Sequence, residues 1–309
     1  MKYQFLKLQF QTAVHFGDGG LTTCENIIPA DTLFSALCCE AAKIGEGTLK
    51  MLVDYAKEGK IAITDALPFI KERYYVPKPM FRFTAHQSQD SSERKVYKKL
   101  AFLPIDQMNA FIHGKMDAGK ETDFFHDNYG KFYLVQKAAI TGKEEPKPYS
   151  VELFRFKEES GLYVCIAYTD EDALDNVLDL FDSLQYTGLG GKVSSGYGRF
   201  IARPVGNSEI LLRRVQEDSF KRWMSLSICL PRDEELENAL EDAGYLVAKR
   251  GGFIASESYA DTARKKNDLY ALKAGSVFVH KFKGDVYDVS EGGAHPVYRY
   301  AKPFFLGVM

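Results

Sequence analysis

The chain is organised around residues 188–200, which read GLGGKVSSGYGRF. Five glycines fall within the eleven residues from Gly188 to Gly198. Glycine adopts positive φ easily and has no Cβ, so its backbone N–H groups can approach a ligand closely. Successive N–H groups in a turn also form a concave site for anions. On the glycines alone, a turn between a helix and a strand explains the segment equally well.

The other side chains of this loop favour a site for a polyanion. Lysine, arginine and serine carry the donors that phosphate oxygens accept, and a tyrosine ring offers a flat face on which a base can stack. No acidic residue occurs from Gly188 to Arg203. The residues expected to face the polyanion are Gly190, Gly191, Lys192, Ser194, Ser195, Tyr197 and Arg199.

Two familiar nucleotide-binding motifs do not fit the loop. A Walker A loop needs glycine where Tyr186 stands and serine or threonine where Val193 stands. A dinucleotide fingerprint starting at Gly188 needs its third glycine at position 193 and a preceding strand, whereas residues 171–185 have the pattern of a helix. The sequence therefore predicts neither ATP nor NAD, and we expect no cofactor.

Composition sets further limits on the function. The 309 residues have a net charge of −2 and a pI near 6.3, which argues against a free-standing nucleic-acid binder but allows a local basic surface inside an assembly. The sequence has no apolar run long enough for a membrane span and no signal-peptide core at the N-terminus, so we expect a cytoplasmic protein. The five cysteines and six histidines have no metal-site spacing, and no metal is expected.

A second basic segment lies between residues 71 and 99, where eight cations accompany three acids and aromatic residues are interleaved. Cations with aromatics suit single-stranded nucleic acid, because they combine phosphate neutralisation with base stacking. A solvated loop with ordinary surface lysines is the alternative interpretation. The candidate cations of this segment are Lys78, Arg94, Lys95, Lys98 and Lys99.

The element pattern predicts an α+β protein with antiparallel sheets. Both halves show strands and helices in an order typical of ferredoxin-like units, with a domain boundary at residues 204–207. We expect Asp31 and Asp170 to be the N-caps of two helices. Residues 151–156 and 162–168 alternate in polarity and are expected to pair as a hairpin.

The order of several motifs identifies a family resemblance that spans nearly the whole chain. The sequence resembles the RAMP proteins of CRISPR effector complexes and is most similar to the fourth Csm subunit of the type III-A complex. The motifs are residues 15–17 (HFG), 31–37 (DTLFSAL), 68–69 (PF), 76–79 (VPKP) and 188–200, followed by 246–252, 268–270, 275–278 and 300–303. The resemblance implies two ferredoxin-like domains, residues 1–204 and 205–309, and a β-hairpin thumb within about residues 80–130.

The resemblance also implies a function. Such a subunit is a non-catalytic scaffold that holds the 5′ repeat-derived tag of the guide RNA (crRNA) and contacts a large polymerase-like subunit and a backbone subunit. Its thumb wedges at the junction of tag and guide. Val193 departs from the family pattern, because many relatives carry arginine there. The implied RNA-facing residues are those of the loop and Lys78, to which we add His15, Arg250 and the four cations between residues 94 and 99.

Two other functions remain open from the sequence. The first is a metal-independent endoribonuclease that processes precursor crRNA, with His15 as the candidate general base, since histidine titrates near neutrality. A structural, hydrogen-bonded role for His15 is the competing interpretation. The second is a protein-interaction module that makes no direct RNA contact.

Overall fold

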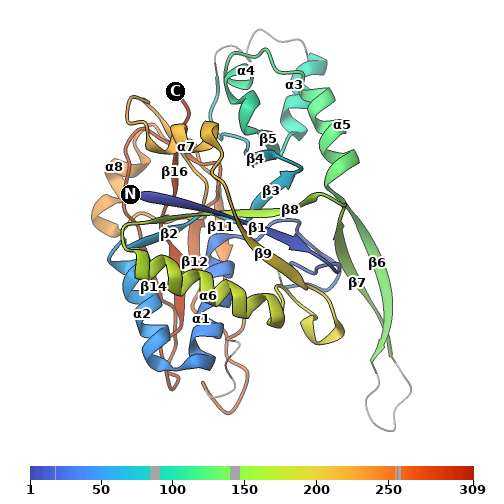
Figure 1. The fold of residues 1–309 in the computed structure, drawn as a ribbon, viewed down its shortest axis with the longest axis vertical. Helices are drawn as coiled ribbons and strands as arrows, with labels where there is room; N and C mark the ends of the chain where they lie inside the picture. Colours follow the sequence, from blue (N-terminus) through green and yellow to red (C-terminus); the bar gives the residue numbers. More distant parts are fainter. Residues whose placement is uncertain (18, 84–90, 140–146, 255, 257–258) are drawn as a thin grey trace.

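An antiparallel sheet of seven strands forms the centre of the N-terminal half (Figure 1). The computed structural model describes residues 1–309 except 18, 84–90, 140–146, 255 and 257–258, and only the backbone of 91–93. The strands follow the order β5-β4-β3-β8-β1-β9, and β2 pairs with the other end of β8. They are β1 (Lys2–Phe10), β2 (Ile61–Ile63), β3 (Leu67–Ile70), β4 (Arg73–Pro77), β5 (Phe102–Pro104), β8 (Ser160–Tyr168) and β9 (Phe200–Val205).

The alternation of side chains along these strands places apolar residues on both faces of the sheet. In the register of β1 with β8, Leu6 lies opposite Val164 and Phe5 lies opposite Cys165. Neighbouring residues of a strand point to opposite faces. Leu6 and Val164 therefore join the core beneath the helices, whereas Phe5 and Cys165 join a second core on the other face.

The connections of the sheet match the predicted ferredoxin-like order in the N-terminal half. The chain runs β1, α1 (Ala30–Ile44), β2, then β8, α6 (Glu171–Thr187) and β9, and these strands lie in the order β9-β1-β8-β2. A further helix, α2 (Glu46–Lys57), packs beside α1. The Asp170 side chain accepts from the N–H groups of residues 172 and 173, which confirms its predicted role as the N-cap of α6.

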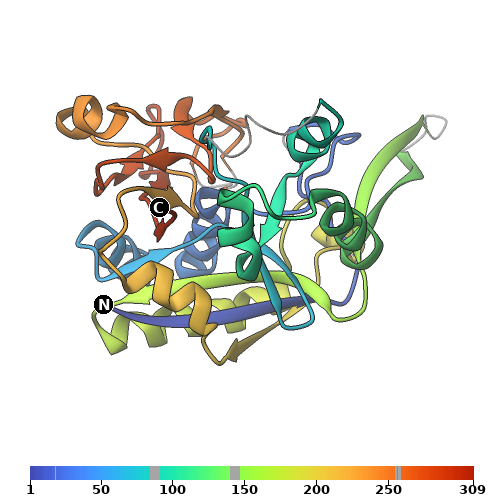
Figure 2. The same cartoon turned by 90° about the horizontal axis from the view of Figure 1, so that it is seen from above.

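The prediction of a β-hairpin within residues 80–130 is wrong for the residues that the structure describes there. The described residues of that range form α3 (Ser91–Lys99), β5, η2 (Ile105–Gln107), α4 (Met108–Ile112) and α5 (Ala118–Tyr129). Residues 84–90 lie outside the described part. The hairpin that projects from the body is formed by β6 (Gly130–Ala139) and β7 (Lys147–Phe156), as Figures 1 and 2 show. β7 thus pairs with β6 and not with β8 as predicted, because β1 and β3 occupy the two edges of β8.

The C-terminal half is less regular than the predicted second ferredoxin-like unit. Its described residues form three separate antiparallel ladders, β13-β10-β16, β11-β12 and β14-β15, in place of one four-stranded sheet. The elements are α7 (Glu209–Gln216), β10 (Trp223–Ser225), η4 (Asp233–Glu235), α8 (Leu236–Leu240), β11 (Val247–Arg250), β12 (Leu269–Leu272), β13 (Val277–Phe278), β14 (Asp285–Asp288), β15 (Tyr298–Ala301) and β16 (Phe305–Gly307). The broader prediction, an α+β protein with antiparallel sheets, is confirmed.

The two halves share their hydrophobic cores. The ring of Tyr300 on β15 lies 5.2 Å from that of Phe34 on α1, and its hydroxyl accepts from the N–H of Ile63 on β2 at 3.0 Å. On the other face of the sheet, Met224 and Leu306 pack in the same core as Phe5. The boundary expected at residues 204–207 therefore separates two stretches of sequence but not two independent cores.

Candidate nucleic-acid interface

The Gly-rich loop has an ordered local structure. Helix α6 ends at Thr187, and Gly188 closes it by donating its N–H to the carbonyl of Leu184 at 2.8 Å. A single 3-10 turn, η3 (Val193–Ser195), follows. It is flanked by two left-handed residues, Lys192 at φ 62° and Gly196 at φ 85°. The loop then enters β9.

Most of the glycines are explained by close contact with residues 12–16. The N–H of Gly191 donates to the carbonyl of His15 at 2.8 Å, and that of Gly198 donates to the carbonyl of Ala13 at 2.9 Å. A Cβ at Gly190 would lie 2.7 Å from the same His15 carbonyl. Several backbone N–H groups that were expected to face an anion are therefore used inside the protein. The binding capacity of the loop lies in its side chains.

His15 is a structural residue in this arrangement. Its side chain is buried, and its Nδ1 lies 2.8 Å from the carbonyl oxygen of Glu152 on β7. Positions for a Cβ at Gly17 and Gly191 would each lie 2.8 Å from the imidazole ring, so both glycines leave room for it. A ring that is enclosed in this way has no open path to an RNA backbone. The geometry favours the hydrogen-bonded interpretation over a general base or an RNA ligand.

The loop also packs against the projecting hairpin. The ammonium group of Lys192 lies 5.3 Å from the ring centroid of Tyr149 on β7, and that of Lys137 on β6 lies 4.4 Å from the ring centroid of Tyr197 in the loop. Lys137 and Tyr149 are direct cross-strand neighbours. Ser194, Ser195 and Arg199 are exposed at the same loop. The loop and the hairpin together thus form one surface that carries cations and aromatic rings.

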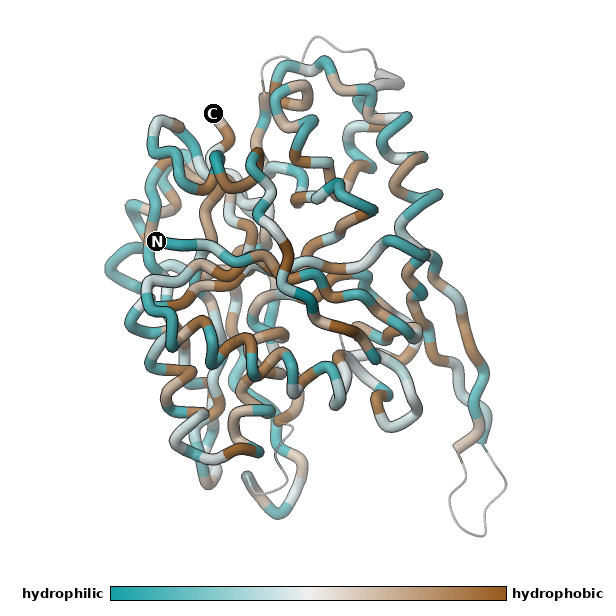
Figure 3. Tube along the Cα trace, viewed as in Figure 1, coloured by the Kyte–Doolittle hydropathy of each residue, from teal (hydrophilic) through white to brown (hydrophobic). Residues whose placement is uncertain are grey.

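The hairpin exposes apolar side chains as well. Figure 3 shows hydrophobic residues continuing along β6 after it has left the body of the molecule. Phe132 is 46% exposed and Leu134 is 63% exposed. Large apolar residues on a projecting strand are unusual for a surface that only meets water. The sequence predicted a strand at residues 151–156, but Lys137 and Tyr149 were not assigned to the site.

The cations of the second basic segment lie on a different part of the molecule. The Lys78 ammonium donates to the carbonyls of Tyr97 and Lys98 at 2.9 and 3.2 Å, so it caps the C-terminal end of α3, and burial lowers its pKa. Helix α3 stands at the top of Figure 1, whereas the loop between α6 and β9 lies in the lower half. The exposed cations of α3 are Arg94, Lys95, Lys98 and Lys99. The structure does not bring this group together with the loop.

Arg250 has an internal partner. Its guanidinium makes a bidentate ion pair with Asp31, with both N–O distances at 2.8 Å, and Arg299 also donates to that carboxylate. Asp31 is therefore not the N-cap of α1, a position that Pro29 occupies without a side-chain hydrogen bond. Arg250 therefore holds the C-terminal half to α1 through a carboxylate that it shares with Arg299.

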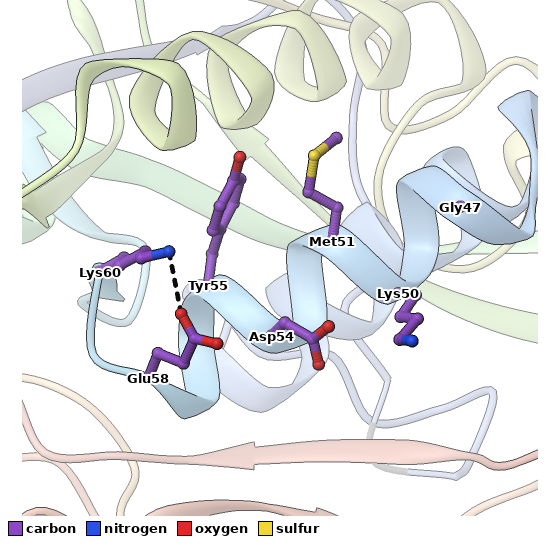
Figure 4. Close-up of a pocket in the computed structure, with 7 residues that line it drawn as sticks. All are labelled: Gly47, Lys50, Met51, Asp54, Tyr55, Glu58 and Lys60. Atoms are coloured by element: carbon purple, nitrogen blue, oxygen red, sulfur yellow. Dashed lines mark ion pairs between the residues drawn. The ribbon is translucent and has the colours of Figure 1, made fainter.

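A pocket along α2 is not suited to a polyanion. The pocket in Figure 4 has a volume of about 290 Å³ and lies along α2. Its lining balances Lys50 and Lys60 against Asp54 and Glu58, and Lys60 pairs with Glu58 at 2.9 Å. A balanced lining does not attract a polyanion. Within the described residues there is no cluster of metal-ligating side chains, and no helix among them is long and apolar enough to cross a membrane.

Comparison with known proteins defines the class first. Residues 7–201 match the model of the RAMP superfamily, which covers more than half of the chain and includes the sheet, α6 and the Gly-rich loop. The chain is therefore a RAMP protein. Residues 218–308 match the model of the CRISPR Csm4 C-terminal domain.

Whole-chain relatives then define the family. The CRISPR system Cms protein Csm4 of Mycobacterium tuberculosis (strain ATCC 25618 / H37Rv) is 40% identical over 295 residues, which cover 95% of this chain and 94% of the relative. The Csm4 protein of Streptococcus thermophilus is 34% identical over 314 residues, with 99% and 98% coverage. The chain belongs to the Csm4 family of the RAMP superfamily.

Solved structures share the fold. A chain of the crystal structure of the Csm3-Csm4 subcomplex in the type III-A CRISPR-Cas interference complex superposes with a TM-score of 0.70 at 20% identity, over 98% of this chain and 99% of that chain. The Csm1-Csm4 cassette in complex with cA4 gives a TM-score of 0.63 at 18% identity, with 100% and 98% coverage.

Proposed function

We propose that this chain is the subunit of a type III-A CRISPR interference complex that binds the 5′ repeat-derived tag of crRNA and bridges the large signalling subunit to the backbone filament. The observation that carries the proposal is the surface formed by the Gly-rich loop and the β6–β7 hairpin. There, two lysine side chains lie over tyrosine rings, which is a combination that suits single-stranded nucleic acid.

The projecting hairpin is the element that we assign to the thumb. It extends beyond the body of the molecule, next to the loop, and presents exposed apolar side chains at Phe132 and Leu134 (Figures 1 and 3). Apolar groups of this kind can wedge between bases, whereas the helices between residues 91 and 129 pack onto β3 and β4 and extend no comparable arm.

A non-catalytic role has the better support from the geometry. The endoribonuclease alternative requires a general base near the loop, and His15 is the histidine that lies there. Its Nδ1 is bonded to a main-chain carbonyl and its ring is enclosed by the glycines of the loop. A general base must reach the proton that it abstracts, and His15 is poorly placed to do so.

A protein-binding face also supports membership of an assembly. The outer face of the β11-β12 ladder exposes Val247 and Tyr270, and the adjoining Tyr245, Leu246 and Phe253 are exposed as well. Large apolar side chains that are exposed together on one ladder typically mark a protein contact. The relatives whose structures match this fold were crystallised with Csm1 or Csm3. We therefore propose that the β11-β12 face contacts a partner subunit.

The RNA-binding proposal is tested by purifying the tagged chain from its native cell and sequencing the bound RNA. We expect guide RNAs that share one 5′ tag, and we expect the double variant Lys192→Glu, Arg199→Glu to lose most of that RNA. The matched control is Lys50→Glu on α2, which is exposed far from the loop and should leave the RNA content unchanged. Equal RNA content in the loop variant and the control would contradict the proposal.

The same purification tests the protein-binding face by mass spectrometry. Tyr270→Glu places a charge in the middle of the apolar face, and burying an unpaired charge is costly. We expect this variant to lose either the large subunit or the backbone subunit, and the missing subunit identifies the partner. Retention of both subunits would contradict the assignment of this face.

A further inference from the structure

Four side chains at the boundary between the Gly-rich loop and the hairpin form two reciprocal pairs. Lys192 of the loop lies over the ring of Tyr149 of the hairpin, and Lys137 of the hairpin lies over the ring of Tyr197 of the loop. Lys137 also stands directly opposite Tyr149 in the strand register, so the four side chains are neighbours on one face of the hairpin. All four are half-buried.

Both rings rest on an apolar base. Tyr149 and Tyr197 pack against a small cluster formed by Ala13, Val151 and Leu153, each of which is buried. One face of each ring is thereby supported by the protein, while a lysine covers a ring face from the other segment. A supported ring with a removable cover is prepared to receive a flat ligand at little conformational cost, because the aromatic side chains are already ordered.

We propose that Tyr149 and Tyr197 form a two-ring stacking platform for unpaired RNA bases. In the free chain, Lys192 and Lys137 cover the platform; when RNA binds, bases replace the ammonium groups on the rings, and the ammonium groups move to the phosphates. The inference rests on the proposed RNA-binding function and adds to it two hairpin residues, Tyr149 and Lys137, and the class of contact that each residue makes.

The relative strengths of the interactions favour this exchange. A cation over an aromatic ring at a partly exposed site contributes about 0.5–1 kcal/mol. A base stacked on an aromatic side chain contributes about 1–3 kcal/mol. Each displaced lysine then gains a phosphate partner, which adds a salt-dependent contribution. Base stacking and the new lysine–phosphate contacts therefore both favour the RNA-bound state over the free state. Stacking tolerates any base, because every base has a π-face.

The backbone of Lys192 supports a specific role for its side chain. Lys192 adopts φ 62°, in the left-handed region that glycine prefers. Most of the other described residues with positive φ are glycines. A non-glycine residue held in this region costs roughly 1–2 kcal/mol. Such strain is concentrated at functional positions. Here the strained residue is the one whose ammonium group lies over Tyr149.

The test compares two probes on the full chain: a single-stranded oligoadenylate of about ten nucleotides and an abasic ribose-phosphate strand of the same length, both followed by fluorescence anisotropy at several salt concentrations. The wild type should bind oligoadenylate more tightly than the abasic strand. Tyr149→Leu and Tyr197→Leu keep an apolar body over the cluster but remove the ring. Each should weaken oligoadenylate binding by roughly 5- to 100-fold and leave abasic binding and the salt slope unchanged.

Three further variants separate stacking from charge and from folding. Tyr149→Phe retains the ring and should bind both probes like the wild type. Lys137→Met should weaken binding of both probes and reduce the salt slope by about 0.7. Phe124→Leu, which removes an exposed aromatic ring on α5, is the matched control and should change neither affinity.

The outcomes distinguish this inference from the function on which it rests. The stacking platform would be overturned if the wild type bound the two probes with equal affinity. It would also be overturned if the Tyr→Leu variants lost affinity for both probes equally. Either result would leave RNA binding by charge intact. A wild-type chain that binds neither probe, together with a native complex that contains no guide RNA, would contradict the proposed function itself.

Discussion

Asp31 is the residue through which the N-terminal helix α1 holds the C-terminal half. Burial opposes its ionisation, but hydrogen bonds and charges from Arg250 and Arg299 prevail and lower its pKa. A lowered carboxyl pKa contributes stability that is present above the ordinary pKa and is lost as the pH falls through the folded-state value. Asp31→Asn should cost about 3–5 kcal/mol, because it leaves the buried Arg299 and the partly buried Arg250 without their counter-charge.

The loss at Asp31 is measured by urea unfolding at neutral pH. The matched control is Glu171→Gln, which removes the ion pair between Glu171 and Lys2. These two side chains are 58% and 69% exposed, respectively. Surface pairs of this kind contribute about 1 kcal/mol or less. If the two substitutions have equal effects, Asp31 does not anchor the C-terminal half.

Asp65 has the opposite dependence on pH. It is fully enclosed, and burial raises its pKa to about 7, although Ala30 and Ile228 donate N–H groups to its Oδ1 at 2.7 and 2.9 Å. The folded state then binds a proton that the unfolded state releases above its ordinary pKa near 4, so stability falls as the pH rises from about 4 to about 7. Asp65→Asn keeps the acceptor oxygen and has no charge to bury.

The variant Asp65→Asn should therefore be more stable than the wild type at pH 8, by on the order of 4 kcal/mol, and should match it near pH 4. Unfolding free energies measured at several pH values between 4 and 8 give the comparison. If the variant shows the same pH dependence of its unfolding free energy as the wild type, another group is responsible for that dependence.

At the scale of elements, the Gly-rich loop offers a pair of glycines that differ in their surroundings. Gly190 and Gly196 both have positive φ, so alanine costs roughly 1–2 kcal/mol of backbone strain at either position. A Cβ at Gly190 would additionally meet the His15 carbonyl and the Phe16 ring at 2.7 and 2.9 Å, whereas a Cβ at Gly196 meets nothing within 4 Å. Gly190→Ala should therefore destabilise the chain clearly more than Gly196→Ala in thermal unfolding, and should weaken RNA binding by displacing the loop. Equal losses in stability would mean that the loop does not depend on its contact with residues 12–16.

Elements could be predicted from the sequence better than their partners. The helical pattern of residues 171–185 predicted α6 nearly to its ends, because that signal is local. Helix α5 has a weak sequence pattern, since Gly119 and a mixed polar sequence interrupt it. Its local signal is Asp117, which accepts from the Lys120 N–H at the N-cap. Strand β7 was identified but given the wrong partner, because pairing depends on which sheet edges are already occupied.

At the scale of the whole molecule, the sequence predicted the loop as the site and could not predict its context. The cations and Tyr197 of the loop lie together because they are close in sequence. Lys78 was included from the basic segment and the family motif at residues 76–79, and Arg250 was added to that set, but both have internal partners that are distant in the chain. Tyr149 and Lys137 reach the site only because the hairpin folds beside the loop, a contact that no local pattern records.

The shared cores lead to a prediction for the whole chain. Although the sequence divides into two family segments, 7–201 and 218–308, Tyr300 and Ile228 of the second pack in the same core as Phe34 of the first. Calorimetry should therefore show one cooperative unfolding transition.

Tyr300→Phe should lower the unfolding free energy of the whole chain by about 1–3 kcal/mol, because the buried N–H of Ile63 loses its acceptor. Tyr245→Phe, at an exposed position, should change it by less than about 0.5 kcal/mol. Two separate transitions, of which Tyr300→Phe shifts only one, would show that the halves are independent domains.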